Sequence, residues 1–185
     1  MSESYADSRT KRAYDLCLAT LLLVLTAPVL LPALLVNVFS TGGRPVFVQR
    51  RAGRNRKEFG LLKLRTMRKR NGGENWSYMT SVSDERLTFF GKVLRRLYID
   101  ELPQLINVLA GHMSMIGPRP ETLETTEEIA ENNPRFSRRM NVKPGLTGVA
   151  QIFFRKPASD HDLWRRYYYD RVYITRSSFV FDLRL

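Results

Sequence analysis

The pattern of apolar and polar positions is dominated by one long apolar segment near the N-terminus. Residues 16–39 read LCLATLLLVLTAPVLLPALLVNVF and carry no charge. A helix rises about 1.5 Å per residue, so these 24 residues would span roughly 36 Å, enough to cross a bilayer. Pro28 and Pro32 lie near the middle, and each removes a backbone donor and disfavours a straight helix. The pattern therefore predicts a membrane helix with a proline break.

Basic residues flank this segment on both sides, which bears on its topology. Arg9, Lys11 and Arg12 precede it, and six further basic residues follow it between positions 44 and 57. Because positive charge favours the cytoplasmic side, both ends prefer the same face, and a re-entrant hairpin that dips in and returns is favoured. A straight or kinked span is one alternative. A cleaved signal peptide is another, although Pro28 follows directly after its would-be cleavage site.

Asp15 stands at the start of the apolar segment. A carboxylate that faces lipid is costly, so we expect Asp15 to pair with Lys11, with Arg12 or with an arginine from later in the chain. The alternative is an interfacial carboxylate solvated by headgroup water.

After the apolar segment, short alternating runs replace the long one. From Val46 to Gln49 successive residues alternate as they do along a β-strand, and residues 59–64 form a second strand-like run. Gly53 supplies a turn signal between the two runs, so the pattern predicts a β-hairpin. Its basic residues fit either a solvated face or a patch for membrane surfaces and phosphates. Residues 69–83 are polar and predict a loop.

The pattern from residue 84 to residue 109 is helical, with an interruption. Apolar side chains recur at helical spacing at Leu87, Phe90, Leu94 and Leu97. Asp84 is a candidate N-cap, and Pro103 suits the first turn of a second helix. This places Asp100 and Glu101 at a helix–helix junction, where backbone donors are free.

The last third of the chain carries three further patterns. Glutamates spaced by three or four predict a solvated helix face without chemistry, at Glu121, Glu124, Glu128 and Glu131. Residues 142–151, VKPGLTGVAQ, carry turn signals that either open backbone N–H groups toward a phosphate or base or make a plain turn. The aromatic and basic tail after residue 161 fits a membrane interface or packing on the core.

Composition narrows the choice of partner. The chain has 30 Lys and Arg against 18 Asp and Glu, a net charge of +12, which favours nucleic acid, nucleotide-sugar phosphates or anionic lipid headgroups. A length of 185 residues with 43% hydrophobic residues fits one domain. Cys17 is the only cysteine, so an intrachain disulfide is excluded and a reducing compartment is suited.

The segment from residue 95 to residue 120, RRLYIDELPQLINVLAGHMSMIGPRP, holds the groups that phosphoryl chemistry needs. Asp100 can attack phosphorus, and Glu101 can hold a proton or share a cation. Arg95 and Arg119 can bind phosphate oxygens in a bidentate mode, with Arg119 on a stiff Gly-Pro-Arg-Pro turn. Taken alone, an Asp-Glu pair is more often a helix cap or a surface salt bridge.

These motifs together resemble the bacterial sugar transferases. The resemblance rests on KRAYDL before the apolar segment, GRPVFVQRRAG, FGLLKLRTM, LRRLYIDELPQLINVLAGHMSMIGPRP and VKPGLTGVAQ, and it covers roughly residues 10–183. It implies a monotopic polyprenol-phosphate phosphoglycosyl transferase. The implied fold is a helix-rich, mixed α/β fold with a re-entrant N-terminal helix, a small β-hairpin or sheet and interfacial amphipathic helices. We expect one domain over residues 1–185, with the membrane helix at 10–40 and the catalytic part at 44–185.

The resemblance also implies a ping-pong reaction. Asp100 would attack a UDP-sugar, keep a covalent phosphosugar and release UMP. Undecaprenyl phosphate would then accept the phosphosugar, and the product would start a bacterial glycan. Glu101 matches the second residue of the catalytic pair, and Mg²⁺, carried by Asp100, is the implied cofactor.

Further residues acquire roles by the same motif matching. The implied phosphate or nucleotide contacts are Lys63, Arg95, Pro118 and Arg119, and Asp15 and Pro28 match the positions that anchor and break the re-entrant helix. The implied partners are a UDP-sugar, undecaprenyl phosphate and membrane lipids, without nucleic acid. The expected location is the bacterial inner membrane, with the catalytic part on the cytoplasmic face. The sequence leaves the oligomeric state open, a homodimer included.

The chain departs from the family pattern at two positions. Ala27 stands where relatives often have serine before the break proline, and QIFFR, residues 151–155, replaces the more common Gln-Val-Asn-Gly-Arg. Arg155 is assigned the role of the arginine in that motif. Larger relatives add an N-terminal membrane domain, so we expect the minimal catalytic form here. The competing hypothesis is a non-catalytic basic protein that binds membrane surfaces or nucleic acid through its charge.

Overall fold

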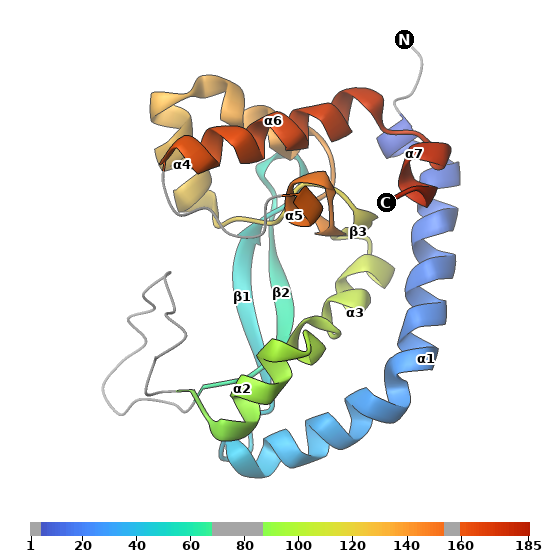
Figure 1. Cartoon of the computed structure of the whole chain (residues 1–185), viewed down its shortest axis with the longest axis vertical. Coiled ribbons are helices and arrows are strands. Elements are labelled where there is room, and N and C mark those ends of the chain that lie inside the picture. The colour runs from blue at the N-terminus through green and yellow to red at the C-terminus, as the bar shows by residue number, and fades with distance from the viewer. Residues whose placement is uncertain (1–4, 68–86, 154–159) are drawn as a thin grey trace. The chain divides into compact units, whose positions relative to one another are not determined.

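The computed structural model describes residues 5–67, 87–153 and 160–185. Figure 1 shows the elements in chain order. The α-helices are α1 (Arg9–Ser40), α2 (Phe89–Arg96), α3 (Gln104–Leu109), α4 (Leu123–Asn132), α5 (Val149–Phe153), α6 (Asp160–Arg176) and α7 (Phe179–Leu183). The strands are β1 (Val46–Ala52), β2 (Glu58–Leu64), β3 (Ser114–Ile116) and β4 (Gly145–Thr147). Short 3₁₀ helices are η1 (Tyr5–Asp7), η2 (Arg54–Arg56), η3 (Ile99–Glu101) and η4 (Pro134–Asn141).

The chain forms two compact units whose segments alternate along the sequence. Unit 1 comprises residues 1–22, 49–61 and 105–185, and unit 2 comprises residues 23–48 and 62–104. Both α1 and the β1–β2 hairpin contribute residues to both units. The helix-rich content with small sheets agrees with the mixed α/β fold predicted from the sequence, whereas the single-domain organisation stays a prediction.

The apolar segment is a single helix, α1, of 32 residues that includes both Pro28 and Pro32. Within the described residues, α1 is long and apolar enough to cross a membrane, by length and composition. Many of its large apolar side chains are exposed, among them Leu25, Leu35 and Phe39. The helix runs on through both prolines instead of ending at them, so the re-entrant topology stays a prediction.

The predicted hairpin is confirmed, because β1 and β2 form a two-stranded sheet and run side by side (Figure 1). Gly53 closes its turn by donating from its N–H to the carbonyl of Lys57, at 2.9 Å. A Cβ atom at Gly53 would lie 2.7 Å from that same carbonyl oxygen, a distance that real side chains essentially never show. The turn therefore requires glycine at this position.

The core of unit 2 joins α1, β2 and α2. Leu30 and Ala33 of α1 pack with Leu64 of β2 and Leu94 of α2, and all four are buried. Partly buried apolar side chains surround this cluster, at Leu23, Leu34, Phe90, Ile99 and Leu102. Since Ile99 and Leu102 bracket residues 100 and 101, burial of these two side chains fixes the backbone that carries the candidate carboxylates.

Helix α2 begins later than the sequence pattern predicts. Its N-cap is Thr88, whose hydroxyl oxygen accepts from the Gly91 N–H, so the prediction of a helix capped by Asp84 is wrong. Leu87 forms an isolated antiparallel β-bridge with Met67 instead. The helical spacing at Leu87 was coincidental, because this residue is extended and lies before the helix cap.

Unit 1 contains a parallel pair of short strands, β3 and β4, in which Ser114 pairs with Gly145 and Ile116 with Thr147. The N–H of Gly145 donates to the carbonyl of Pro118 at 2.8 Å, and the N–H of Gly117 donates to the carbonyl of Thr147 at 2.9 Å. Residues 145–147 therefore form a strand rather than a plain turn, and the N–H of Gly145 is paired within the protein instead of open toward a phosphate or base.

The aromatic tail packs mainly on unit 1. Tyr167 and Tyr173 of α6 are buried, and the hydroxyl of Tyr173 donates to the carbonyl of Ile116 at 2.8 Å. Tyr168 and the α7 residues Phe179 and Val180 are exposed. Of the two interpretations of the tail, core packing holds for these buried tyrosines, and an interfacial position stays open for the exposed side chains.

Candidate active site

The carboxylate pair lies on η3, the 3₁₀ turn that follows α2 in the chain and precedes α3, as the sequence predicted. Asp100 is buried with 8% of its surface exposed, whereas Glu101 is partly exposed. Tyr98 precedes the turn in the left-handed region, with φ 58°, which is uncommon for a residue other than glycine. Pro103 stands directly before the first residue of α3, where its missing N–H costs nothing.

A lysine from β2 faces this pair. The Nζ of Lys63 lies 2.9 Å from Oε1 of Glu101, and both side chains are about one-fifth exposed. Because β2 and η3 both pack on the core of unit 2, the two charges are held close by elements that are 38 residues apart in the chain. The structure thus brings Lys63, Asp100 and Glu101 together, and the implied phosphate contact of Lys63 stays a prediction.

The electrostatics of Asp100 are unusual for an aspartate. Its pKa is raised from 3.8 to about 6, chiefly because burial penalises the charged carboxylate and secondly because Glu101 lies beside it. The Lys63 and Arg95 charges lower the pKa and partly oppose these effects. At neutral pH the carboxylate is therefore mostly ionised yet poorly solvated, which suits a nucleophile.

Arg95 lies on the last turn of α2 and completes the group of candidate residues in unit 2. Its Nε donates to the hydroxyl oxygen of Thr66 at 2.9 Å. A guanidinium has five N–H donors, and this bond uses the single one on Nε. Arg95 thus combines a fixed position with donors suited to an anion near Asp100.

The carboxylates fit a magnesium ion only together with substrate. Within residues 5–67, 87–153 and 160–185, no group of three or more His, Cys, Asp or Glu side chains could hold a metal. Mg²⁺ in phosphate-handling sites is commonly bound by one or two carboxylates plus substrate phosphates and water. Asp100 and Glu101 match that donor set, with Asp100 the better candidate because Lys63 already pairs with Glu101.

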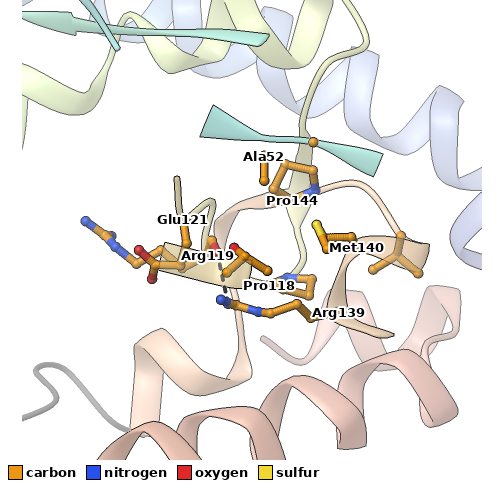
Figure 2. Close-up of a pocket in the computed structure, with 10 residues that line it drawn as sticks. Ala52, Pro118, Arg119, Glu121, Arg139, Met140 and Pro144 are labelled. Atoms are coloured by element: carbon orange, nitrogen blue, oxygen red, sulfur yellow. Dashed lines mark hydrogen bonds between the residues drawn. The ribbon is translucent and has the colours of Figure 1, made fainter. Parts of the chain in front are cut away.

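The other predicted phosphate contacts, Pro118 and Arg119, belong to unit 1. Both line a pocket that also includes Arg139 and Met140, shown in Figure 2. The guanidinium of Arg139 donates to the backbone carbonyl of Arg119 at 3.0 Å and lies 2.8 Å from a carboxylate oxygen of Asp170. The prolines restrict the Gly-Pro-Arg-Pro turn, and the hydrogen bond from the buried Arg139 to its backbone restricts it further.

Glu121 corrects the interpretation of the acidic block. It precedes α4 and forms ion pairs with Arg166, at 2.7 Å, and with Arg51, at 3.5 Å, so its assignment to a solvated face is wrong. Glu124, Glu128 and Glu131 do lie on α4 and are exposed. The spacing alone could not separate Glu121 from the rest, because its arginine partners come from distant parts of the chain.

Two of the predicted anchor residues, Lys11 and Asp15, belong to a buried network in unit 1. The Nζ of Lys11 lies 2.9 Å from Asp15 and 2.8 Å from Asp182, and Asp15 also accepts from the Ser114 hydroxyl and the Met115 N–H, both at 3.0 Å. Asp15 is 2% exposed, so the expected pairing with Lys11 is confirmed and the alternative of a carboxylate in headgroup water is wrong.

Arg12, which was a second candidate partner for Asp15, binds backbone carbonyl groups instead. Its guanidinium donates to the carbonyls of Val108, at 2.7 Å, and Leu109, at 2.8 Å, at the C-terminal end of α3. A cation there satisfies carbonyl groups that the helix itself leaves unpaired. Arg155 lies outside the described residues, and its assignment stays a prediction.

Sequence reasoning missed several residues that organise these sites. Thr66, Arg139 and Asp170 carry no spacing signal, since their partners lie far away in the chain. Asn37 did offer one: it is the lone amide in an apolar segment, and such polar residues commonly have a specific partner. Its side chain is fully buried and donates to the carbonyls of Pro45 and Arg65, both at 2.9 Å.

Comparison with known proteins bears directly on this arrangement. The family model "Bacterial sugar transferase" matches residues 6–185, which is nearly the whole chain and includes every candidate residue. The chain belongs to the bacterial sugar transferase family.

Three relatives illustrate the range of names and sequence identities among the curated proteins that this chain matches. A UDP-glucose:undecaprenyl-phosphate glucose-1-phosphate transferase of Caulobacter vibrioides is 42% identical over 142 residues, which cover 77% of this chain and 53% of that protein. A UDP-N-acetylgalactosamine-undecaprenyl-phosphate N-acetylgalactosaminephosphotransferase of Aeromonas hydrophila is 34% identical, covering 94% of this chain and 41% of that protein. The uncharacterized sugar transferase EpsL of Bacillus subtilis is 39% identical, covering 95% of this chain and 82% of that protein.

This bacterial sugar transferase thus spans about half the length, or less, of the first curated relatives that it matches. Its candidate active site nevertheless lies within the matched family region.

Proposed function

We propose that this protein transfers a phosphosugar from a UDP-sugar to undecaprenyl phosphate, giving undecaprenyl-diphosphate-sugar and UMP. The observation that carries the proposal is the buried Asp100, with its pKa raised to about 6, beside Glu101, Lys63 and Arg95 in a chain of this family. Two relatives are named for the same type of reaction, with glucose and with N-acetylgalactosamine. The identity of the sugar is therefore left to experiment.

The reaction proceeds in two displacements at the same phosphorus atom. A carboxylate oxygen of Asp100 attacks the phosphorus that carries the sugar, a new O–P bond forms, and the bond to the UMP oxygen breaks with its electron pair leaving on UMP. A phosphate oxygen of undecaprenyl phosphate then attacks the same phosphorus, and the Asp100 carboxylate is released. Because the carboxylate is both nucleophile and leaving group, its ionised form must be restored after each turnover.

The surrounding residues support this chemistry by charge. The positive charges of Lys63 and Arg95 act on Asp100 and would attract the diphosphate of the substrate. The terminal nitrogens of the Arg95 guanidinium suit bidentate contact with phosphate oxygens. Glu101 is held by Lys63 and is placed to accept or return a proton as substrates enter and leave. Mg²⁺, when bound by Asp100 with substrate phosphates, would neutralise phosphate charge and favour departure of UMP.

The membrane segment supports access to the lipid substrate. Helix α1 exposes apolar side chains along its length and adjoins the core of unit 2 through Leu30 and Ala33. We propose that α1 enters the inner membrane as a re-entrant helix, with the catalytic residues on the cytoplasmic face. A helix held in this way would keep the active site at the surface, where a soluble nucleotide sugar and a lipid phosphate can both reach it.

A substrate screen tests the proposal. The purified protein in detergent or nanodiscs is supplied with Mg²⁺, undecaprenyl phosphate and a panel of UDP-sugars, and UMP is measured. We expect one or a few sugars to release UMP in amounts that depend on the lipid acceptor, and none to do so with Asp100→Asn. A wild-type protein that releases no UMP from any sugar, while binding DNA or anionic vesicles in a salt-dependent way, would favour the non-catalytic alternative.

A further inference from the structure

We propose that Thr66 is the positioning residue for Arg95, so that its hydroxyl sets the direction in which the guanidinium meets substrate phosphate. This inference rests on the proposed function and adds to it a residue that contacts neither substrate nor the reacting atoms. Thr66 follows the end of β2, is 5% exposed, and lies within unit 2 together with Arg95 and Asp100.

The first observation is the side-chain contact. The Thr66 hydroxyl oxygen accepts from Nε of Arg95 at 2.9 Å. Nε lies between the aliphatic stem and the two terminal nitrogens, so a bond at this atom restricts rotation of the whole planar group. The terminal nitrogens are the pair that binds two phosphate oxygens at once, and their direction is set when Nε is fixed.

The second observation is the backbone contact of the same residue. The carbonyl of Thr66 accepts from the Thr88 N–H at 3.1 Å and from the Thr88 hydroxyl at 3.3 Å. Thr88 is the N-cap of α2, and its hydroxyl in turn accepts from the Gly91 N–H at 2.8 Å. Thr66 therefore fixes where α2 begins as well as the arginine at its last turn.

Gly91 shows how closely the two segments approach. A Cβ atom at Gly91 would lie 2.1 Å from the carbonyl oxygen of Thr66, so only glycine fits. Gly91 and Arg95 are four residues apart and share one helix face. That face therefore contacts Thr66 at two points, through the backbone at Gly91 and through the side chain at Arg95. Both contacts fix the position of Arg95 relative to β2.

This arrangement links Lys63 to Arg95. Lys63 lies three residues before Thr66 in the same segment of chain, and it faces Glu101. Loss of the Thr66 hydroxyl would leave Lys63, Asp100 and Glu101 in place and release only the guanidinium. The predicted defect is therefore specific to the arginine and its phosphate contact.

The test compares Thr66→Val, which keeps the shape and removes the hydroxyl, with Thr66→Ser, which keeps the hydroxyl. We expect Thr66→Val to lower kcat/KM for the UDP-sugar about tenfold, as for a lost hydrogen bond to a charged group, and to weaken UDP binding by a similar factor. In Thr66→Ser, kcat/KM and the affinity for UDP should both lie within about threefold of the wild-type values. Thr41→Val, a change of the same kind in unit 2 at the end of α1, is the matched control and should have no effect.

A double-mutant cycle separates positioning from general stability. Lysine has no Nε donor, so in an Arg95→Lys background Thr66→Val should cause little further loss. Full additivity of the two changes, or wild-type kinetics and UDP affinity in Thr66→Val, would overturn the inference. If Thr66→Val fails to fold, as judged by its melting temperature, Thr66→Ala replaces it in the same cycle.

UMP release by the wild type distinguishes failure of the positioning role of Thr66 from failure of the proposed function. Lipid-dependent UMP release by the wild type with no change in Thr66→Val would overturn the positioning role alone. A wild type that neither releases UMP nor binds UDP would overturn the proposed function, and the positioning role with it.

Discussion

The Nζ of Lys63 lies 2.9 Å from Oε1 of Glu101 and joins β2 to the turn that carries Asp100. Both side chains are partly exposed, so this pair contributes little to stability, in the range of about 0 to 1 kcal/mol for such ion pairs. Its importance is electrostatic. The lysine charge lowers the pKa of Asp100 and opposes the effect of burial, which keeps the proposed nucleophile ionised at neutral pH.

Replacing Lys63 by methionine should therefore shift the pH dependence of the reaction. Without the lysine charge the pKa of Asp100 rises further, so the acid limb of kcat/KM for the UDP-sugar moves to higher pH. Profiles of UMP release against pH measure this. Lys92→Met, on the exposed side of α2, is the matched control and should leave the acid limb unchanged. An acid limb that stays in place in Lys63→Met would contradict the assignment.

Asp100→Asn should stabilise the fold at neutral pH while it removes activity. The folded-state pKa of Asp100 is about 6, above its value of 3.8 as a free group, so folding favours the protonated form. Its contribution to stability is present below pH 3.8 and is lost as the pH rises through about 6. A shift of about two units corresponds to roughly 3 kcal/mol.

The measurement is unfolding of the wild type and Asp100→Asn at pH 4 and at pH 7.5. From pH 4 to pH 7.5 the free energy of unfolding of the variant should rise relative to that of the wild type by up to about 3 kcal/mol. A difference between the two proteins that does not depend on pH would rule out the raised pKa.

Removal of the Asp15 carboxylate should destabilise the protein strongly. Asp15→Ala leaves the Met115 N–H without its acceptor, removes one of the two acceptors of the Ser114 hydroxyl and takes one of two carboxylates from Lys11. Loss of one partner from a buried ionic network costs about 3 to 5 kcal/mol, and Asp182 still pairs with Lys11, so we expect about 3 kcal/mol. Glu128→Ala on the exposed face of α4 should change the stability by less than about 0.5 kcal/mol. Equal melting temperatures for the two variants would argue against the network.

Several features could be predicted from the sequence because they depend on near neighbours. Lys11 and Asp15 are four residues apart, which places them on one helix face, and the pairing was expected. The hairpin and the position of Asp100 and Glu101 between two helical segments followed from turn and proline signals. The residues that hold the catalytic groups did not, because Thr66 meets Arg95 only after the chain returns from a distant segment.

Two wrong predictions have the same physical origin. Glu121 matched the spacing of a solvated helix face, yet it lies before α4 and pairs with Arg166 and Arg51 from distant parts of the chain. Residues 145–147 carried turn signals, yet pairing with β3 made them a strand. In both cases tertiary partners decided a local pattern that was ambiguous in sequence.

The topology of α1 is tested by cysteine labelling. Single cysteines at Ser4 and at Ser40, in a Cys17→Ser background that removes the exposed native thiol, are exposed to a membrane-impermeant reagent in intact and in opened cells. The re-entrant arrangement predicts that both positions are labelled only after the cells are opened. Labelling of one position in intact cells would instead show that α1 crosses the membrane.

The central claim, that Asp100 forms a covalent phosphosugar, is tested most directly by trapping that species. The protein is incubated with Mg²⁺ and a UDP-sugar radiolabelled in its sugar, without lipid acceptor, and the label on the denatured protein is counted. We predict label on the wild type and on the control Asp7→Asn, its removal by hydroxylamine or by added undecaprenyl phosphate, and none on Asp100→Asn. Label that persists on Asp100→Asn would contradict the account.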